Sequence, residues 1–396
     1  MGDDHGQKHK ADTAEFTRRA AALVPKLAQR RRETLDLRRL PETTVADILD
    51  AGFFKIMQPA RLGGFELPYG SQVPISAALA PGCGATSWIV SVVATHHWML
   101  AKFDAKAQDD VWAKNPNAYA CSAFGFAEAN VAKVDGGYKV SGRWTYSSGS
   151  NHADWAMIVL AVPRDGQSPE RRFAMVPRSE FQALDNWRSV GLRGSGSNDI
   201  VVRETFVPDY RTIGFDEIDL VDSPGTKVNR APSYRLQTFG VFNLTGVGPA
   251  IGLAKAALDA FTDGIKQRRG TFGAKLAELQ NIQIRVSESS AEIDAARHIA
   301  EYHIGHFQQE AMTGKGADKT HILKHQRDCA YIGRLCTRAA ERLAEAQGAG
   351  GLSEDNPLQQ ALADIKGVCA HITMGWDANS VPYGKSLLGI EHQGMI

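Results

Sequence analysis

Two adjacent histidines, His96 and His97, lie in a strongly apolar segment, residues 85–103, whose composition predicts a buried helix. An imidazole whose pKa lies near neutrality can take up or release a proton and so assist a reaction. A histidine on an apolar helix is, however, more often a packed core residue. The pair therefore has both a catalytic and a structural interpretation.

Other polar residues that could bind a small molecule lie in short runs. Ser148 belongs to WTYSSG at 144–149, where a strand-end serine commonly satisfies turn backbone. Ser122 belongs to ACSA at 120–123, where an inward-facing strand serine is the ordinary explanation. Arg268 and Arg269 precede TFG and have the composition of a solvated basic turn.

The glycine clusters do not match the fingerprint of a dinucleotide-binding fold, which needs G-x-G-x-x-G between a strand and a helix. The cluster at 194–197 leads into a predicted strand, and GLRGSGSND around it suggests a backbone nest near a bound ligand. Gly246, Gly248 and Gly252 begin a helix with no strand before it, which indicates close helix packing. The chain is not expected to bind NADH in this way.

Composition excludes further classes. Lys and Arg total 45 against 44 Asp and Glu, so a formal net charge of +1 gives no field to attract nucleic acid or an anionic membrane. No run of eighteen apolar residues predicts a membrane span, and the polar start resembles no signal peptide. The cysteines form no CxxC pair, so we expect reduced thiols, no metal site and a cytoplasmic chain: Cys83, Cys121, Cys329, Cys336 and Cys369.

The elements that must position these residues fall into an order of helices, strands and helices, which predicts an α+β fold. After a flexible tail, 1–12, apolar residues at three and four spacing predict an N-terminal α domain, 13–116. Period-two runs predict a small antiparallel β domain, 117–212, followed by a connector, 213–238. Breaks near 313–318 and 348–356 divide the remaining segment, 239–396, into the long antiparallel helices of a four-helix bundle.

Three longer runs, TYSSGSNHADWA, GLRGSGSNDIVVRETFVPDYR and KQRRGTFGAKLAELQNIQ, resemble the acyl-CoA dehydrogenase superfamily in order and spacing over nearly the whole chain. LRRLPE, GATSWIVSVVATHHW and NWRSVGLRGSGSN are more closely similar to the oxygenase components of two-component flavin hydroxylases, including those acting on p-hydroxyphenylacetate and on phenolic steroid rings. The resemblance implies a central β-barrel-like domain, a C-terminal four-helix bundle and a homotetramer.

The glutamate base that acyl-CoA dehydrogenases use has no counterpart here. The C-terminal stretch where that family carries it reads CAHITMGWD, and residues 244–253, the second place the family uses, contain no Glu. Dehydrogenation of an acyl-CoA by bound FAD is therefore disfavoured as an alternative. A subunit that binds flavin without catalysis is a further alternative.

The resemblance implies a reaction in which a separate NAD(P)H:flavin reductase supplies reduced FMN, with FADH2 as the second choice of cofactor. Dioxygen would add to the flavin as a C4a-hydroperoxyflavin, which hydroxylates a small aromatic, phenolic substrate. Oxygenation of an indole, thioether or amine is the alternative. Two residues keep this alternative substrate class open, Trp376 and Lys366. Lys366 stands where some relatives have histidine.

The resemblance also assigns roles to individual residues. His96 and Ser122 would contact the substrate hydroxyl, and His97 would be packing. Ser148 would lie beside flavin N5, and His371, in the C-terminal helix, would face flavin C4a. The remaining flavin contacts would be Tyr146 and Trp144 beside the ring or its side chain, Arg235 near a negatively charged flavin, and Arg268 or Arg269 at the flavin phosphate across a subunit interface.

Overall fold

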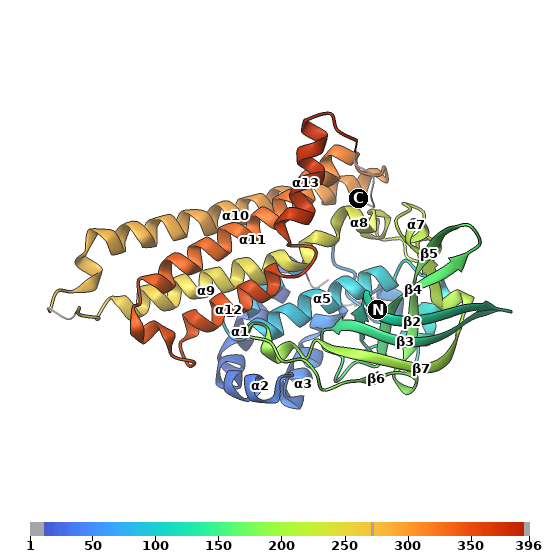
Figure 1. The fold of residues 1–396 in the computed structure, drawn as a ribbon, viewed down its shortest axis with the longest axis horizontal. Coiled ribbons are helices and arrows are strands. Elements are labelled where there is room, and N and C mark those ends of the chain that lie inside the picture. Colours follow the sequence, from blue (N-terminus) through green and yellow to red (C-terminus); the bar gives the residue numbers. More distant parts are fainter. Residues whose placement is uncertain (1–11, 271–272, 392–396) are drawn as a thin grey trace, which may run out of the picture.

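The computed structural model describes residues 12–270 and 273–391 (Figure 1). Helices come first in this part of the chain, then strands, then the long helices of the C-terminal third. The predicted flexible tail lies outside the described residues except for Asp12, whose carboxylate accepts a 2.8 Å hydrogen bond from the Glu15 amide and caps the first helix. The order of elements predicted from the sequence is confirmed.

The N-terminal helices end where their capping residues predict. Gly52 has φ 78°, a left-handed conformation that glycine adopts without steric cost, and it terminates α3. Asp104 caps α6 by accepting from the Lys106 amide at 2.8 Å. The helices are α1 (Thr13–Gln29), α2 (Arg31–Leu37), α3 (Glu42–Ala51), α4 (Gln72–Leu79), α5 (Gly84–Leu100) and α6 (Ala105–Trp112).

The central part consists of two four-stranded sheets that pack together, with β2 against β4 and β1 against β3. The first sheet has the order β1 (Ala120–Ala123), β4 (Trp155–Arg164), β5 (Gln167–Pro177), β8 (Thr212–Gly214). The second has the order β2 (Gly125–Val134), β3 (Gly137–Ser147), β7 (Asn198–Pro208), β6 (Gln182–Ala183).

Strand direction departs from the prediction at one place. The hairpin between β2 and β3 turns at Asp135 and Gly136 as the sequence predicts, and Gly136 has φ 73°. The expectation of a wholly antiparallel domain is wrong, because β1 pairs with β4 in parallel. Between these two strands the chain crosses to the second sheet and back, so it re-enters the first sheet in its original direction.

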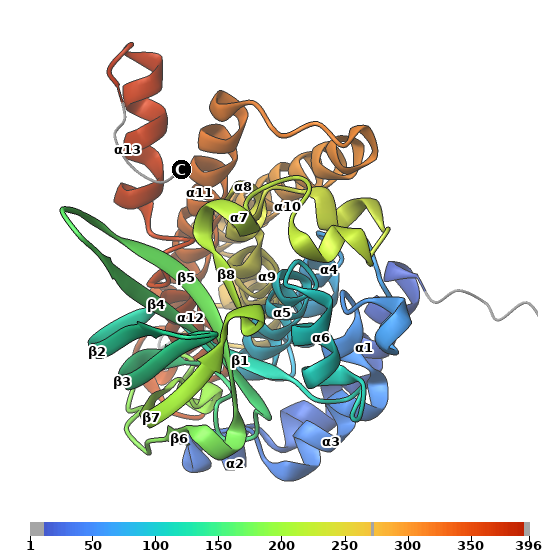
Figure 2. The ribbon, with the colours of Figure 1, turned by 90° about the vertical axis from the view of Figure 1, so that its right-hand side faces the viewer.

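The C-terminal helices form the predicted four-helix bundle, seen side-on in Figure 1. Its helices are α9 (Val247–Ile265), α10 (Gln280–Thr313), α11 (Lys319–Glu345) and α12 (Pro357–Cys369). The gaps after α10 and α11 fall at the two predicted breaks. A further helix, α13 (Trp376–Leu387), packs against α11 and projects beyond the bundle in both views (Figures 1 and 2).

The segment between the sheets and the bundle contains short helical elements, including α7 (Phe215–Ile218) and α8 (Thr238–Val241). The α+β fold class is confirmed, and we propose the domain boundaries 13–116, 117–212, 213–238 and 239–396 as the working division. One described segment, Thr238–Ile265, is long and apolar enough to span a membrane by length and composition. Of its most apolar window 83% is buried inside the structure, as in a core helix.

Close packing of α9 on α4 explains the second glycine cluster. A Cβ at Gly248 would lie 2.2 Å from Ser76 Oγ, and one at Gly252 would lie 2.3 Å from the Ala77 carbonyl oxygen. Either methyl group would push the two helices apart. The packing interpretation of these glycines is therefore confirmed, and it fixes the bundle against the N-terminal helices.

Candidate active site

Helix α5 runs through the interior, between the first sheet and the bundle (Figure 2). All 17 of its residues are buried, which agrees with a composition that is apolar on every side. Trp88 and His96 lie eight residues apart on it, or about 12 Å along the helix axis. Each of the two contacts a different serine, so α5 supports two polar groups in an otherwise apolar interior.

The first polar group joins His96 to Ser122. Strand β1 places the Ser122 Oγ 2.7 Å from His96 Nε2, and both side chains are nearly or fully buried. The other ring nitrogen, Nδ1, lies 3.3 Å from the Ala120 carbonyl oxygen. The two residues that the resemblance assigns to the substrate hydroxyl are thus hydrogen-bonded to each other.

Hydrogen-bond chemistry fixes the direction of this pair. A carbonyl oxygen only accepts, so Nδ1 must carry the hydrogen of the neutral imidazole. Nε2 is then an acceptor, and the Ser122 hydroxyl donates to it. The Ser122 oxygen keeps a lone pair with which it can accept a hydrogen bond from a ligand hydroxyl.

Burial changes the acid–base behaviour expected for His96. Loss of hydration, opposed by the hydrogen bond to the Ala120 carbonyl and assisted by His371, lowers its pKa to about 3. The expectation of a pKa near neutrality is therefore wrong. His96 is neutral over the ordinary pH range and accepts a proton only as part of a reaction that delivers one.

Aromatic rings surround this pair on one side. Phe124 lies edge-on to His96 with ring centroids 6.0 Å apart. Its ring leads into a group of contacting phenylalanines contributed by the β domain and the segment before the bundle. We call this group the aromatic cluster; it consists of Phe124, Phe173, Phe215, Phe239 and Phe242.

The second polar group is centred on Ser148, which follows the last residue of β3. The Trp88 indole donates to the Ser148 Oγ at 2.9 Å, and the Ser197 Oγ lies 2.8 Å from it. Ser195 Oγ lies a further 2.6 Å from Ser197. The two turns are also joined by backbone, because the Gly149 amide donates to the Ser195 carbonyl at 2.9 Å.

His371 connects the two groups from the bundle side. It lies in the turn after α12 rather than in a helix, so the predicted helical position is wrong. Its ring meets Trp88 edge-on at 5.2 Å, and its Nδ1 lies 2.8 Å from the Thr373 hydroxyl. Loss of hydration lowers its pKa to about 4, so it too is neutral.

The two aromatic residues of β3 have different surroundings. Tyr146 is 69% exposed and faces Trp187 with ring centroids 5.9 Å apart, so the two rings form an aromatic wall that begins two residues before Ser148 in the chain. Trp144 is fully buried inside the β domain and donates to the Val159 carbonyl at 2.8 Å. Trp144 is therefore a packing residue in this structure, as aromatic strand residues commonly are.

The predicted cationic residues lie away from both polar groups of the same chain. Arg235 is exposed beside Gly314, at the end of α10. Arg268 and Arg269 follow α9 at the outer end of the bundle (Figure 1), and Arg269 donates to the Gly273 carbonyl at 2.8 Å. The 19 residues of α9 correspond to roughly 28 Å of helix. No hydrogen bond in the described part of the chain joins these arginines to either polar group.

The residues weighed for other substrates are also remote. Lys366 pairs with Glu341 at 2.9 Å on the outer side of the bundle, and both side chains are well exposed. Trp376 packs against Tyr331 and lies under the Arg334 guanidinium. Neither residue contacts the two polar groups.

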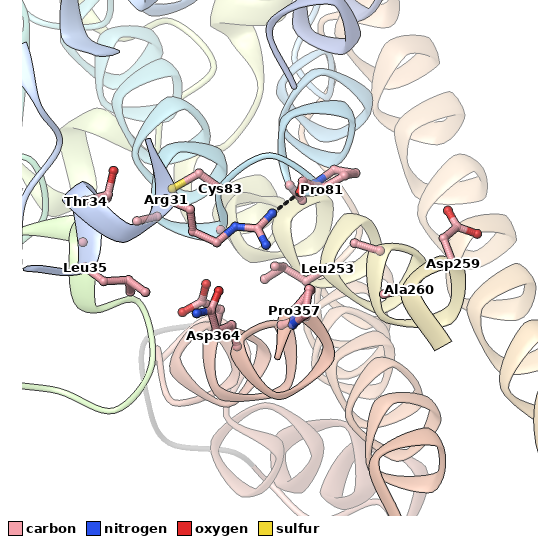
Figure 3. A pocket seen from close by; sticks show the side chains of 17 residues that line it. Arg31, Thr34, Leu35, Pro81, Cys83, Leu253, Asp259, Ala260, Pro357 and Asp364 are labelled. Atoms are coloured by element: carbon pink, nitrogen blue, oxygen red, sulfur yellow. Dashed lines mark hydrogen bonds between the residues drawn. The ribbon is translucent and has the colours of Figure 1, made fainter. Parts of the chain in front are cut away.

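A cavity of about 240 Å³ lies behind the loop that carries Ser195 and Ser197 (Figure 3). Arg31 and Asp364 both line it. The Arg31 guanidinium donates to the Pro81 carbonyl at 2.6 Å, and Asp364 accepts from the Leu192 amide at 2.6 Å. Because no residue of the two polar groups lines this cavity, it is a structural space and Asp364 anchors the loop to α12.

The residues present suit an uncharged or anionic aromatic cofactor better than a metal ion. Among the described residues, no group of three or more His, Cys, Asp and Glu side chains is arranged to hold a metal. The Tyr146–Trp187 wall, with Tyr146 exposed and Trp187 half-buried, begins two residues before Ser148 in the chain. A flavin ring has the flat apolar faces and polar edge that such a wall and hydroxyl would bind.

Some residues of the two polar groups were predicted from the sequence and others were not. The structure brings together His96, Ser122, Ser148 and His371. Trp88 and Ser197 were missed although they stand in the quoted runs GATSWIV and GLRGSGSN, because a tryptophan or serine in an apolar or glycine-rich run gives no sign of its partner. Trp187 was missed for the same reason.

Comparison with known proteins gives three kinds of similarity. Residues 244–376 match the family model described as acyl-CoA dehydrogenase, C-terminal domain. The chain is 31% identical to the flavin-dependent monooxygenase oxygenase subunit HsaA of Rhodococcus jostii, over 94% of this chain and 98% of that protein. It is 32% identical to the FADH2-dependent resorcinol hydroxylase oxygenase component of a Rhizobium species, over 95% and 94%.

Solved structures agree. The 3-HSA hydroxylase from Rhodococcus sp. RHA1 has a TM-score of 0.91 at 30% identity and covers 96% of this chain and 98% of its own. XiaF from Streptomyces sp., solved with FADH2 and glycerol, has a TM-score of 0.88 at 25% identity, covering 96% of each chain. Both similarities extend over the helices, the sheets and the bundle.

Proposed function

The chain belongs to the oxygenase components of flavin-dependent monooxygenases, and we propose that it hydroxylates a small phenol with reduced flavin and dioxygen. The observation that carries the phenol is the neutral His96–Ser122 pair, at 2.7 Å, beside the aromatic cluster. Phenylalanine rings favour a flat apolar substrate, and the pair supplies an acceptor for one hydroxyl. The resorcinol hydroxylase component named above acts on a phenol.

The His96–Ser122 pair would move a proton away from the substrate. The substrate hydroxyl donates to the Ser122 oxygen, and the Ser122 hydroxyl donates to His96 Nε2. When the substrate ring is attacked, its hydroxyl proton becomes more acidic and passes through Ser122 to His96. The Ala120 carbonyl, which accepts from Nδ1, then stabilises the imidazolium.

The chemistry that oxygenates the ring is supplied by reduced flavin, when bound, together with dioxygen. The chain's own residues orient the two reactants and keep water out. Ser148 with the Tyr146–Trp187 wall would hold the flavin edge and face, and Trp88 with His371 would pack at the side of the reactants without separating them. The burial of α5 along its whole length supports a site closed to solvent.

The partners follow from the same proposal. A separate NAD(P)H:flavin reductase would supply reduced FMN in preference to FADH2, in the cytoplasm. The chain would act as a homotetramer, in which Arg268 or Arg269 of one copy contacts the flavin phosphate of another. The exposure of these arginines and their place after α9, at the outer end of the bundle, support that assignment. Arg235, beside Gly314, would act from another copy as well.

The test is a reconstitution with defined components. The purified chain is mixed anaerobically with photoreduced FMN or FAD and one member of a panel of phenols, indoles and thioethers, and air is then admitted. Catechol-type products from phenols, identified by mass spectrometry, are expected. Oxidation of NADH by the chain without a reductase, or oxygenation confined to indoles or thioethers, would contradict the proposal.

A further inference from the structure

Strand β1, which carries Ser122, lies at the edge of the first sheet, so one side of its backbone has no neighbouring strand. In the part of the chain that the structure describes, its one paired neighbour is β4, in parallel register. Helix α5 also packs against β1. A buried sheet edge has backbone N–H and C=O groups that must find partners outside the sheet. Those partners decide how β1 lies against α5.

The adjacent histidines of α5 both bind the backbone of Ala120 in β1. The Ala120 amide donates to His97 Nε2 at 3.4 Å, and His96 Nδ1 donates to the Ala120 carbonyl oxygen at 3.3 Å. The preceding residue, Tyr119, accepts on its carbonyl from the Trp155 amide of β4 at 3.2 Å. The backbone groups of successive strand residues point to opposite sides, so both groups of Ala120 face α5. Two side chains thus replace the missing neighbouring strand.

The bond to the Ala120 amide fixes the tautomer of His97. A backbone N–H only donates, so Nε2 is the bare acceptor and Nδ1 carries the hydrogen. The Phe54 carbonyl is close enough to raise the pKa of His97, although it forms no hydrogen bond of normal geometry with Nδ1. Loss of hydration, assisted by His96, outweighs that carbonyl and lowers the pKa of His97 to about 3. His97 is therefore a neutral hydrogen-bond acceptor and not an acid or base.

We propose that His97 is a positioning residue that holds β1 in the place where the Ser122 hydroxyl donates to His96. Ser122 follows Ala120 by two residues, about 7 Å along the strand, so a shift of Ala120 moves Ser122 with it. The Ser122 Oγ lies 2.7 Å from His96 Nε2, and lengthening by about 1 Å would break this hydrogen bond. The inference rests on the proposed function, because that function assigns the same pair to the substrate hydroxyl.

Loss of the His97 acceptor would also affect His96 through its other ring nitrogen. The Ala120 carbonyl accepts from Nδ1 and so leaves Nε2 bare to accept from Ser122. Without His97, the buried Ala120 amide has no partner on the side of α5, and the backbone is expected to shift until it finds one. His96 then loses the carbonyl that fixes its tautomer. Both members of the proposed relay thus depend on the Ala120 backbone that His97 holds.

His97 also packs against Trp112, edge-on with ring centroids 5.2 Å apart, which is the packing role expected from the sequence. Two substitutions separate packing from positioning. His97→Phe keeps an aromatic ring and removes the acceptor. His97→Gln removes the ring and places an amide oxygen near the position of Nε2. A packing residue would tolerate phenylalanine better than glutamine, whereas a positioning residue would show the reverse order.

The experiment supplies each variant of the whole chain with reduced FMN, dioxygen and the phenol that gives most product in the reconstitution above. The ratio of hydroxylated product to hydrogen peroxide should fall about tenfold in His97→Phe, the size of one lost buried hydrogen bond, and stay near the wild-type value in His97→Gln. Adding His97→Phe to Ser122→Ala should cause no further loss, because His97 acts through that pair.

Trp112→Phe is the matched control. The Trp112 indole donates to the Ala118 carbonyl at 3.1 Å, so this variant removes a buried hydrogen bond to the same segment without touching Ala120. It should lower the thermal midpoint and keep the wild-type ratio of product to peroxide. An equal fall of that ratio in Trp112→Phe and His97→Phe would make His97 a packing residue.

Crystal structures of the variants provide a readout that does not depend on turnover. The Ser122 Oγ–His96 Nε2 distance should exceed about 3.5 Å in His97→Phe and stay near 2.7 Å in His97→Gln. If Ser122→Ala itself keeps the wild-type ratio of product to peroxide, the proposed phenol site is wrong. If Ser122→Ala lowers the ratio but His97→Phe changes neither the ratio nor the distance, the site stands and the inference about His97 is wrong.

Discussion

The interior of the protein and the ends of its helical bundle present opposite chemistry. Along α5 the functional groups are neutral: two imidazoles, an indole and hydroxyls, each hydrogen-bonded or packed within the chain. At the outer end of the bundle, after α9, Arg268 and Arg269 are exposed. Neutral groups thus lie where a substrate would be enclosed, and cations lie where they remain hydrated.

The difference follows from the cost of burying charge. An ionised group without a partner is strongly destabilised in an apolar interior, which is why burial lowers the pKa of both His96 and His371. The phosphate of a cofactor is bound best by cations. An exposed arginine stays hydrated in the single chain and would contact such a phosphate when another copy of the chain assembles with it. The comparison predicts different consequences for substitutions in the two regions.

The largest effect is expected for His96→Ala. Removing the proton acceptor should reduce hydroxylation by about a hundredfold, the ordinary size of general-base assistance, while reduced flavin still binds and oxygen is still consumed. The measurement is the ratio of hydroxylated product to hydrogen peroxide at saturating phenol. Product formation with wild-type coupling would make His96 a packing residue.

Ser122→Ala sharpens the same prediction. If the proton passes through Ser122, the two single variants and the double variant should have similar losses, because residues of one relay do not act additively. Additive losses would mean that His96 and Ser122 act separately. The low pKa of His96 also predicts that no step from its titration occurs in the pH profile of hydroxylation between about pH 5 and 9.

The exposed region predicts a smaller effect of a different kind. Loss of a charge-assisted contact to a phosphate costs about 1.5–3 kcal/mol, so Arg268→Ala or Arg269→Ala should weaken flavin binding by roughly ten- to a hundredfold. The loss should appear in the flavin dissociation constant and not in the rate at saturating flavin. Lys266→Ala is the matched control, since Lys266 is an exposed cation of the same turn that pairs with Asp263 at 2.8 Å.

The assembly state provides the second half of that test. If the arginines act across an interface, mixing Arg269→Ala chains with site-defective Ser148→Ala chains should produce some subunits in which an intact site faces an intact arginine. Flavin affinity should then partly recover in the mixture. No recovery in mixed oligomers would place the arginine contact within one chain or remove it altogether.

A smaller change is expected for Ser148→Ala, which removes a single neutral donor or acceptor from the flavin edge. One neutral hydrogen bond contributes about 1 kcal/mol, which corresponds to roughly a fivefold increase in peroxide release per turnover. Trp144→Phe is the comparison, because Trp144 lies inside the β domain and bonds Val159. That variant should change thermal stability and leave peroxide release at the wild-type level.

The fold was predictable from the sequence because its signals are local. Gly52 and Asp104 end or begin helices through their own backbone or side chain, and the glycine-rich gap after Thr313 separates two bundle helices. The parallel pairing of β1 with β4 was not predictable in this way, since strand direction depends on how the chain crosses between sheets. Local patterns carry no information about such crossings.

The candidate site likewise has features that the sequence predicts and features that depend on the folded structure. The pairing of His96 with Ser122 agrees with the family resemblance, yet the pKa of His96 could not be read from residue type, because it depends on the burial of the whole of α5. The hydrogen bonds that run from the Trp88 indole through Ser148 and Ser197 to Ser195 join residues up to 107 positions apart in the sequence (195 minus 88). No rule of sequence spacing connects such distant residues. The pKa of His96 and these hydrogen bonds both depend on tertiary contacts.

Asp364 is the one carboxylate that hydrogen-bonds the loop of Ser195 and Ser197, and it tests how the interior tolerates charge. Burial raises its pKa to about 6 against an ordinary value of 3.8, although the Leu192 amide and Arg31 oppose the shift. A raised carboxyl pKa means that the folded protein binds more protons than the unfolded chain between about pH 4 and 6. This group therefore lowers stability progressively as pH rises through that window, and its full cost is present above it.

The last prediction uses this sign. Asp364→Asn removes the charge and keeps a carbonyl oxygen for the Leu192 amide, so above pH 6 its thermal midpoint should exceed that of the wild type by roughly 2 °C. Near pH 4 the difference should vanish, because wild-type Asp364 is then protonated. Asp259→Asn is the control, since Asp259 lines the same cavity but is exposed and pairs with Lys255. A difference between Asp364→Asn and wild type that is the same at pH 4 and pH 7 would show that Asp364 stabilises the loop by geometry alone, and that charge at this position costs the folded protein nothing.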